Sequence, residues 1–232
     1  MHSNQDLVSV IMSVYNDEEN IGNAIKSILN QTYKNLEILI IDDGSTDNSK
    51  NVLKFYEKKD KRIILLKNDI NLGLTKSLNI LIEKANGTYI ARQDSDDISK
   101  TNRIEKQITF MKSHDLDACS SKALIKGSNK VIPRYSYYFP ISFVLRYKNP
   151  VIHGTLILKS NVFEKIGKYD EEYVFSQDYE LMIRLQKKNL NMKIYKEKLY
   201  ILNMEDNISS KHKVSQEEFA RKARLQYLNK NV

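Results

Sequence analysis

The sequence predicts an α/β domain, a Rossmann-like α/β/α sandwich with a mostly parallel central sheet. Four short apolar runs, each typical of a strand buried on both faces, alternate with segments in which apolar residues recur at helical spacing. Polar and mostly acidic residues directly follow the first, second and fourth of these runs. The length of 232 residues suits one such domain with a substantial core.

The regular pattern fills the first 100 residues. The expected strands are residues 7–14, 36–41, 63–66 and 89–91. The helices between them are expected around the apolar residues Ile21, Ile25, Leu53, Tyr56, Leu78 and Ile82. Asn16 and the acidic residues after it offer an N-cap and first turn to the first helix, and Asn86 with Gly87 ends the third.

The second half of the chain is less regular. Its expected elements are a helix around Ile104 and Met111, strands at 118–125 and 155–158, and a helix opened by Asp178. The tail has a helical pattern and carries six Lys or Arg against two Glu. Because neither an internal repeat nor a linker interrupts the chain, we interpret it as one domain. Its expected parts are a nucleotide-binding half at 7–100, an acceptor-binding half at 101–210 and a basic C-terminal helix at 211–232.

An acidic cluster after the fourth strand is the strongest candidate for a site. Asp94, Asp96 and Asp97 fall within four residues, and like charges this close repel one another. A divalent cation that also holds phosphate oxygens would remove that repulsion. In parallel sheets, ligands bind beyond the carboxyl ends of the strands, so Tyr15 and Asp43 are expected on the same rim. The alternative is a solvated acidic turn that caps the next helix.

The composition narrows the class of protein. Hydrophobic residues make up 41% of the chain, which suits a globular protein. No apolar run reaches the roughly 18 residues that span a bilayer, and the first residues do not resemble a signal peptide. A single cysteine, Cys119, excludes an internal disulfide, and a cytoplasmic location is expected. The net charge of +8 suits nucleic acid, anionic lipid or phosphorylated substrates as partners.

Several common nucleotide and hydrolase motifs are missing from the sequence. No GxGxxG follows the first strand, and no GxxxxGK[ST] or GxSxG occurs. A nucleotide site without a glycine-rich cradle needs another way to neutralise phosphates, and a metal ion is the simplest. This favours the cation interpretation of the acidic cluster.

Four motifs together resemble the inverting glycosyltransferases of family 2, which have the GT-A fold. The resemblance covers about residues 7 to 205 and rests on segments 10–16, 42–47, 94–97 and 176–181. It implies roles for individual residues of a site, with Asp97 a candidate for either nucleotide or metal binding. These roles are catalytic base for Asp178; nucleotide binding for Ser13, Tyr15, Asp43, Lys76 and Asp94; binding of Mn²⁺ or Mg²⁺ for Asp96, with Asp97 and Glu205 as further candidates; and an acceptor contact for His153.

The sequence departs from the family pattern at one place. Many members carry a late Arg-x-His-x-x-x-Ser segment whose histidine completes the metal site, whereas this chain has Asn203 and Glu205 at the arginine and histidine positions. A glutamate can still bind a hard cation through oxygen. The alternatives are an extra water on the metal, or His212 as the ligand.

The less regular half predicts the acceptor side. Aromatic residues interleave with Arg134 and Arg146, a pattern that suits stacking on sugar rings, contact with a membrane surface, or a partly buried edge of the domain. The basic tail suggests peripheral attachment to the inner face of the cytoplasmic membrane. Nucleic acid is not expected as a partner, because the predicted functional rim is acidic.

The resemblance therefore implies a metal-dependent inverting enzyme, a hexosyl- or N-acetylhexosaminyl-transferase. It would move a sugar from a nucleotide-diphosphate sugar, with a UDP-sugar expected, to a glycan or lipid-linked acceptor in bacterial surface polysaccharide or lipooligosaccharide synthesis. One alternative is a catalytically impaired homologue that binds glycans or nucleotide sugars, because of Glu205. Another is a sugar nucleotidyltransferase, which would need a glycine-rich loop with Arg or Lys where Asp17 and Glu18 stand.

Overall fold

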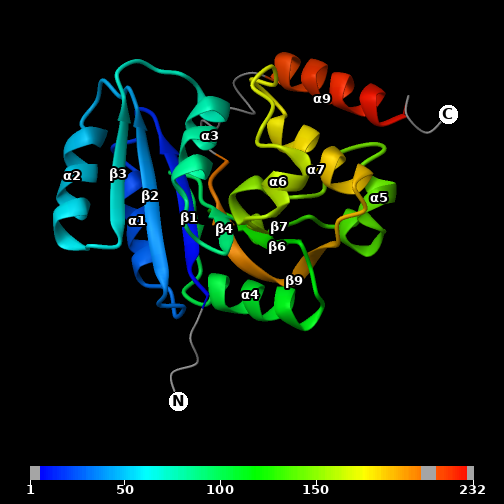
Figure 1. Ribbon diagram of the computed structural model, residues 1–232, viewed down its shortest axis with the longest axis horizontal. Helices are drawn as coiled ribbons and strands as arrows, with labels where there is room; N and C mark the ends of the chain where they lie inside the picture. Colours follow the sequence, from blue (N-terminus) through cyan, green and yellow to red (C-terminus); the bar gives the residue numbers. More distant parts are fainter. Residues whose placement is uncertain (1–5, 205–212, 229–232) are drawn as a thin grey trace.

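The computed structural model describes residues 6–204 and 213–228 (Figure 1). Its first half alternates strands and helices, as the sequence predicts. The elements are β1 (Val8–Val14), α1 (Ile21–Leu29), β2 (Leu36–Asp43), α2 (Ser49–Lys59), β3 (Ile63–Asn68), α3 (Leu74–Lys84) and β4 (Tyr89–Arg92). β1 pairs in parallel with both β2 and β4, and β2 pairs in parallel with β3. The carboxyl ends of these four strands therefore share one edge of the sheet.

The second half extends the same sheet. Its elements are β5 (Ile98–Ser99), α4 (Arg103–Ser113), β6 (Ala118–Ile125), β7 (Val131–Ile132), η1 (Ser136–Tyr138), α5 (Ile141–Val144), η2 (His153–Thr155), β8 (Ile157–Lys159), α6 (Val162–Ile166), α7 (Gln177–Lys187), β9 (Met192–Leu202) and α9 (Lys213–Leu228). Within the described residues, nine strands form one sheet in the order β3-β2-β1-β4-β8-β6-β9-β5, with β7 beside β6. β8 runs antiparallel between β4 and β6, and β9 runs parallel to β6.

Two apolar clusters cover the two faces of the sheet. Alternate residues of β1 separate between them: Val10 and Met12 pack with α1, α2 and α4, whereas Ile11 packs with α3, α6 and α7 (Figure 1). This alternation is the period-2 geometry of a strand, and it explains why β1 reads as a continuous apolar run. The prediction of an α/β sandwich with helices on both faces is confirmed.

The C-terminal helix belongs to the same body. Ala223 of α9 is fully buried against the α7 side, and Phe219 stacks edge-on with Tyr173. In the described parts of the chain, each helix is too short or too polar to cross a membrane. One face of α9 thus packs on the domain, whereas Val214, Leu225 and Leu228 are exposed.

Candidate functional site

The loops after β1 and β2 are joined by hydrogen bonds at the rim. Oδ1 of Asn16 accepts a hydrogen bond from the Thr46 N–H at 2.8 Å, and the Asn16 N–H donates to Oγ of Ser45 at 3.1 Å. Asn16 adopts a positive φ of 48°, a conformation that asparagine tolerates better than most residues. The predicted meeting of these two loops is confirmed.

The predicted nucleotide contacts from the first three strands occupy different environments. Tyr15 is 49% exposed at the rim, and Ser13, two residues before it in β1, is half-buried. Lys76 is exposed in the first turn of α3. Asp43 is 2% exposed, and its carboxylate accepts hydrogen bonds from the N–H groups of Leu72 and Gly73, both at 2.9 Å. Asp43 thus holds the β3–α3 loop at the rim.

The acidic loop after β4 is held by a buried arginine and by the end of β9. Nη2 of Arg92 lies 2.5 Å from Oδ1 of Asp94, and the Arg92 side chain is 2% exposed. Oδ1 of Asp97 accepts the N–H of Asn203 at 2.6 Å, and the Tyr200 hydroxyl also hydrogen-bonds this carboxylate. Asp94 and Asp97 are therefore fixed by the fold, and Asp96 lies between them.

Burial and repulsion act together on this loop. Burial, and next the charge of Asp94, raise the pKa of Asp96 to about 6. Burial, Asp94 and Asp96 in that order raise the pKa of Asp97 well above its ordinary range. The charge of Arg92 only partly offsets the rise at Asp96, and a divalent cation would supply further positive charge.

The donor set fits a hard divalent cation. Asp94 and Asp96 offer carboxylate oxygens, the ligand type that Mg²⁺ and Mn²⁺ prefer. Within residues 6–204 and 213–228, no three His, Cys, Asp or Glu side chains are grouped to hold an ion by themselves. This arrangement matches Mg²⁺ sites in which one or two carboxylates bind the ion and substrate phosphates provide further ligands. The predicted ligand Glu205 and the alternative His212 lie outside the described residues.

Two buried arginines behind the acidic loop were not predicted from the sequence. Arg103 is fully buried; its Nη1 and Nη2 donate to the carbonyls of Gly154 and Arg92, each at 3.2 Å. Its guanidinium also lies 5.5 Å from the ring centroid of Tyr200. Burial lowers the pKa of Arg103 only to about 10, so it stays charged at neutral pH. The one available signal was Arg92 itself, a charge within a strand directly before three carboxylates.

Asp178 lies in the first turn of α7, as predicted. Its Oδ1 accepts the Tyr179 N–H and its Oδ2 accepts Nδ2 of Asn149, both at 2.8 Å. Burial raises the pKa of Asp178 to about 6, although these two hydrogen bonds act in the opposite direction. The charge of Asp94 contributes to the rise, so the two carboxylates influence each other across the site.

A pocket of about 530 Å³ opens beside Asp178. Tyr147 and Asn149 form one wall, and Gln216 and Arg224 of α9 form another. Oγ of Ser176 bonds to the Gln216 carbonyl at 3.0 Å, and Nη1 of Arg224 donates to the Tyr147 carbonyl at 3.0 Å. The C-terminal helix therefore completes the pocket that contains Asp178.

His153 has a neutral, packed ring. Its Nε2 lies 2.7 Å from the Tyr169 hydroxyl, and burial followed by the charge of Arg92 lowers its pKa to about 3. Asn79 of α3 holds Tyr169 in place, because its side chain accepts a hydrogen bond from the Tyr169 N–H and donates one to the Tyr169 carbonyl. The acceptor role of His153 stays a prediction.

Comparison with known proteins gives one family. The sequence model described as glycosyl transferase family 2 matches residues 9–167 of this chain. An uncharacterized glycosyltransferase of Haemophilus influenzae is 34% identical over 246 residues, which cover 98% of this chain and 76% of the relative. The UDP-Glc:alpha-D-GlcNAc-diphosphoundecaprenol beta-1,3-glucosyltransferase WfgD of Escherichia coli is 32% identical over 183 residues, covering 79% of this chain and 71% of WfgD.

Solved structures share the fold. The mannosyltransferase PcManGT from Pyrobaculum calidifontis, in complex with GDP-Man and Mn²⁺, matches with a TM-score of 0.77 at 17% identity. The match covers 96% of this chain and 64% of the PcManGT chain, so this chain spans less than two thirds of that protein. At this identity, the likeness concerns the fold alone.

Proposed function

Since this chain belongs to glycosyltransferase family 2, we propose that it moves a sugar from a nucleotide-diphosphate sugar to a hydroxyl group of a glycan or lipid-linked acceptor. Membership in the family and the GT-A fold were both expected and are confirmed. The observation that carries the proposal is the pairing of an acidic loop, Asp94 to Asp97, with a separate half-buried carboxylate, Asp178, beside a pocket. The division into a donor half (7–100) and an acceptor half (101–210) is part of the proposal.

The donor side uses the carboxylates of the β4–β5 loop. Asp96, with Asp94 beside it, would hold Mn²⁺ or Mg²⁺, which when bound stabilises the negative charge of the departing diphosphate. Tyr15 offers an exposed ring on which a base can stack, and Asp43 keeps the neighbouring loop in place. The fixed positions of Asp94 and Asp97 preorganise the loop before the donor binds.

Asp178 would act as the general base. The acceptor hydroxyl gives its proton to an Asp178 carboxylate oxygen, its oxygen bonds to the anomeric carbon, and the bond from that carbon to the diphosphate oxygen breaks. One base and one displacement, without a covalent intermediate, invert the anomeric centre. A pKa of about 6 keeps Asp178 largely ionised at neutral pH yet basic enough to accept a proton.

The proposed donor and acceptor classes of this chain are taken from those that the name of its relative WfgD states. WfgD is, by its name, a glucosyltransferase that uses UDP-Glc and a diphosphoundecaprenol-linked GlcNAc. We propose a UDP-sugar as the donor and a lipid-linked glycan of a bacterial surface polysaccharide as the acceptor class for this chain too.

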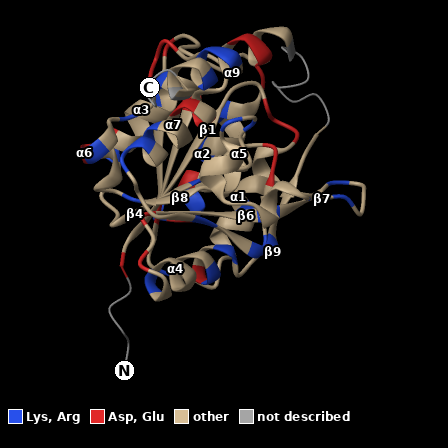
Figure 2. Cartoon of the chain, turned by 90° about the vertical axis from the view of Figure 1, so that its right-hand side faces the viewer, with Lys and Arg blue, Asp and Glu red and all other residues tan. Residues whose placement is uncertain are grey.

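Peripheral membrane contact is part of this proposal, and α9 supports it. Val214, Leu225 and Leu228 are 72%, 48% and 46% exposed, and Arg221 is exposed at the same helical phase. The buried Ala223 lies on the opposite side of the helix. Figure 2 shows α9 at the edge of the molecule, with basic and acidic positions together. Glu217 and Glu218 are also exposed close to this phase, so the exposed face of α9 combines apolar, basic and acidic side chains; its apolar side chains suit shallow insertion into a bilayer.

Hydrolysis of a panel of sugar nucleotides tests the function. The full chain is incubated with UDP- and GDP-sugars in the presence of Mn²⁺, Mg²⁺ or a chelator, and release of the nucleoside diphosphate is measured. Slow metal-dependent hydrolysis of at least one donor is expected. If no donor turns over and none binds with either metal, the transferase proposal is wrong and a non-catalytic homologue is favoured.

A further inference from the structure

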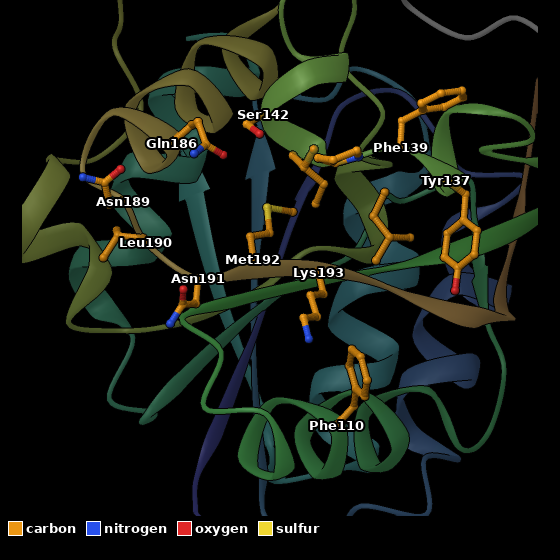
Figure 3. Close-up of a pocket in the computed structure, with 13 residues that line it drawn as sticks. Phe110, Tyr137, Phe139, Ser142, Gln186, Asn189, Leu190, Asn191, Met192 and Lys193 are labelled. Atoms are coloured by element: carbon orange, nitrogen blue, oxygen red, sulfur yellow. The ribbon is translucent and has the colours of Figure 1, made fainter.

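A second pocket of about 660 Å³ lies at the other end of α7 from Asp178. Helix α4, the η1–α5 segment, the end of α7 and the start of β9 form its walls (Figure 3). We call it the distal pocket and define it by the residues used below: Phe110, Tyr137, Phe139, Gln186, Asn189 and Asn191. The catalytic proposal above assigns no role to it.

The lining of the distal pocket combines aromatic rings with side-chain amides. Lys193 is the single charged residue among its lining residues. Within the described residues, the side-chain amides of Gln186, Asn189 and Asn191 make no hydrogen bond to another protein group, and Asn189 and Asn191 are solvent-exposed. Nζ of Lys122 lies 3.6 Å from the ring centroid of Tyr137, which fixes that ring in the wall.

This chemistry fits a neutral sugar chain better than a lipid. Each amide offers both donors and an acceptor, which hydroxyl groups can satisfy, and the rings offer flat apolar faces for the C–H groups of a sugar. A hydrocarbon chain would leave the same amides without partners. The near absence of charge makes an anionic headgroup a poor match.

A row of aromatic rings connects the distal pocket with the pocket of Asp178. Tyr147 lines the Asp178 pocket, and Phe139 lines the distal pocket. Phe143 lies between them, with ring centroids 5.5 Å from Tyr147 and 6.1 Å from Phe139. The three rings are 62%, 46% and 55% exposed in the order Tyr147, Phe143, Phe139. Asp178 and Gln186 are eight positions apart on α7, or about 12 Å at the helical rise.

We propose that the distal pocket is a second glycan-binding subsite, which holds a neutral oligosaccharide portion of the acceptor several sugars away from the reacting hydroxyl. The inference rests on the proposed function, because it takes the acceptor to be a glycan. The aromatic row contacts the sugars between the two pockets, so a long acceptor is bound near both ends of α7.

Fluorine NMR of the full chain tests this without any sugar nucleotide. The seven phenylalanines are replaced by fluorophenylalanine, and each signal is assigned by a Phe→Leu variant. Linear neutral hexasaccharides of glucose, galactose and N-acetylglucosamine are titrated one by one. At least one is expected to shift the signals of Phe110 and Phe139, while Phe55, on the far helix α2, stays unchanged.

A double variant provides the sharper comparison. Q186A with N191A removes two amides from the pocket and is expected to weaken hexasaccharide binding about tenfold. Tyr135→Ala is the matched control, because Tyr135 is 67% exposed in the same segment and lines neither pocket. The control is expected to bind as the wild type does.

Three results would overturn the inference. The first is that no hexasaccharide shifts the signals of Phe110 or Phe139, and the second is that the double variant binds the hexasaccharide as tightly as the wild type. The third is that Phe139→Ser loses binding to lipid vesicles but keeps its binding of sugar, which would make the distal pocket part of a membrane surface. Hydrolysis of sugar nucleotides is measured in parallel. Donor turnover without hexasaccharide binding refutes this inference alone. Hexasaccharide binding without turnover or binding of any donor refutes the transferase proposal and leaves the distal pocket as a glycan-binding site.

Discussion

At the scale of single residues, the acidic loop balances repulsion against buried positive charge. Arg92 contacts Asp94 directly, and Arg103 supports Arg92 from behind through its carbonyl. These cations act on Asp94 more than on Asp96, whose pKa rises to about 6. A bound divalent cation would therefore act mainly through Asp96.

Replacing Asp96 with Asn should stabilise the metal-free protein. The pKa of Asp96 in the folded chain, about 6, exceeds its ordinary value of 3.8, so its contribution to the free energy of unfolding is lost as pH rises from about 4 through 6. Thermal unfolding at pH 8 with a chelator should thus give a higher Tm for Asp96→Asn than for the wild type. Added Mn²⁺ should raise the wild-type Tm and leave the variant unchanged. The control is Asp115→Asn, since this carboxylate is 92% exposed, and its Tm should respond to Mn²⁺ as that of the wild type does. An Asp96→Asn variant whose Tm rises with Mn²⁺ as much as that of the wild type would refute the ligand role of Asp96.

The pH dependence of transfer should report the Asp178 carboxylate. The base must be ionised, so kcat/KM should fall as pH drops below about 6. Asn149→Ala removes a hydrogen bond that favours the carboxylate, and the acid limb should therefore move to higher pH. Asn161→Ala, an exposed asparagine without a side-chain capping bond, should leave the profile unchanged. An acid limb that stays in place in Asn149→Ala contradicts this assignment.

Some site residues were accessible from the sequence and others were not. The three carboxylates and Asp178 stand in short patterns that can be read directly. Arg103 could not be found this way, because a helix residue followed by Ile, Glu and Lys looks like an ordinary exposed arginine. Tyr200 joins the loop from β9, over a hundred positions away, and this contact exists only in the folded sheet.

At the scale of elements, the η2 turn must approach the acidic loop closely. A Cβ on Gly154 would lie 2.5 Å from Oδ2 of Asp94 and would also collide with the buried hydroxyl of Tyr200. Gly154→Ala should therefore displace Asp94 and reduce stability by about 1–3 kcal/mol, as overpacking does. Urea unfolding and Mn²⁺ titration measure the two effects.

Gly22→Ala is the matched control for that substitution. A Cβ at Gly22 in α1 would meet Tyr56 at an ordinary 3.5 Å, so alanine should be neutral or stabilise the helix by up to about 1 kcal/mol. Equal Mn²⁺ affinity of Gly154→Ala and the wild type would show that this close approach does not shape the site.

Three strands of the first half were predictable because both of their faces are buried. In β1, β2 and β4, nearly every position is buried, and the apolar residues among them form the run that marks each strand. β9 was not predicted from the sequence. Lys193, Lys196 and Lys198 break up the apolar pattern of Met192–Leu202, so no continuous apolar run marks this strand. These lysines are exposed although β9 lies between β6 and β5 in the sheet. The expected strand at 155–158 begins at Ile157, since the preceding residues form η2.

At the scale of the whole molecule, α9 links the pocket of Asp178 to the proposed membrane contact. One face of the helix completes the pocket of Asp178, and the opposite stripe is exposed. Substrate presented by a membrane would therefore arrive beside the pocket that holds the proposed base.

Vesicle binding should depend on this stripe. V214S with L225S should reduce co-sedimentation with anionic vesicles, and binding by the wild type should weaken with added salt because the net charge is +8. Phe55→Ser is the control, since Phe55 is 50% exposed on α2. Wild-type protein that stays unbound at low salt would exclude the membrane contact.

Donor binding and proton transfer are expected to be separate functions of separate carboxylates. Calorimetric titration of UDP and GDP, with Mn²⁺ or chelator, into the wild type, Asp96→Asn and Asp178→Asn tests this most directly. Mn²⁺-dependent binding should be lost in Asp96→Asn and kept in Asp178→Asn, whose transfer rate should fall about 10²–10⁴-fold. Nucleotide binding that is independent of Mn²⁺ and of Asp96, or normal transfer by Asp178→Asn, would contradict this separation.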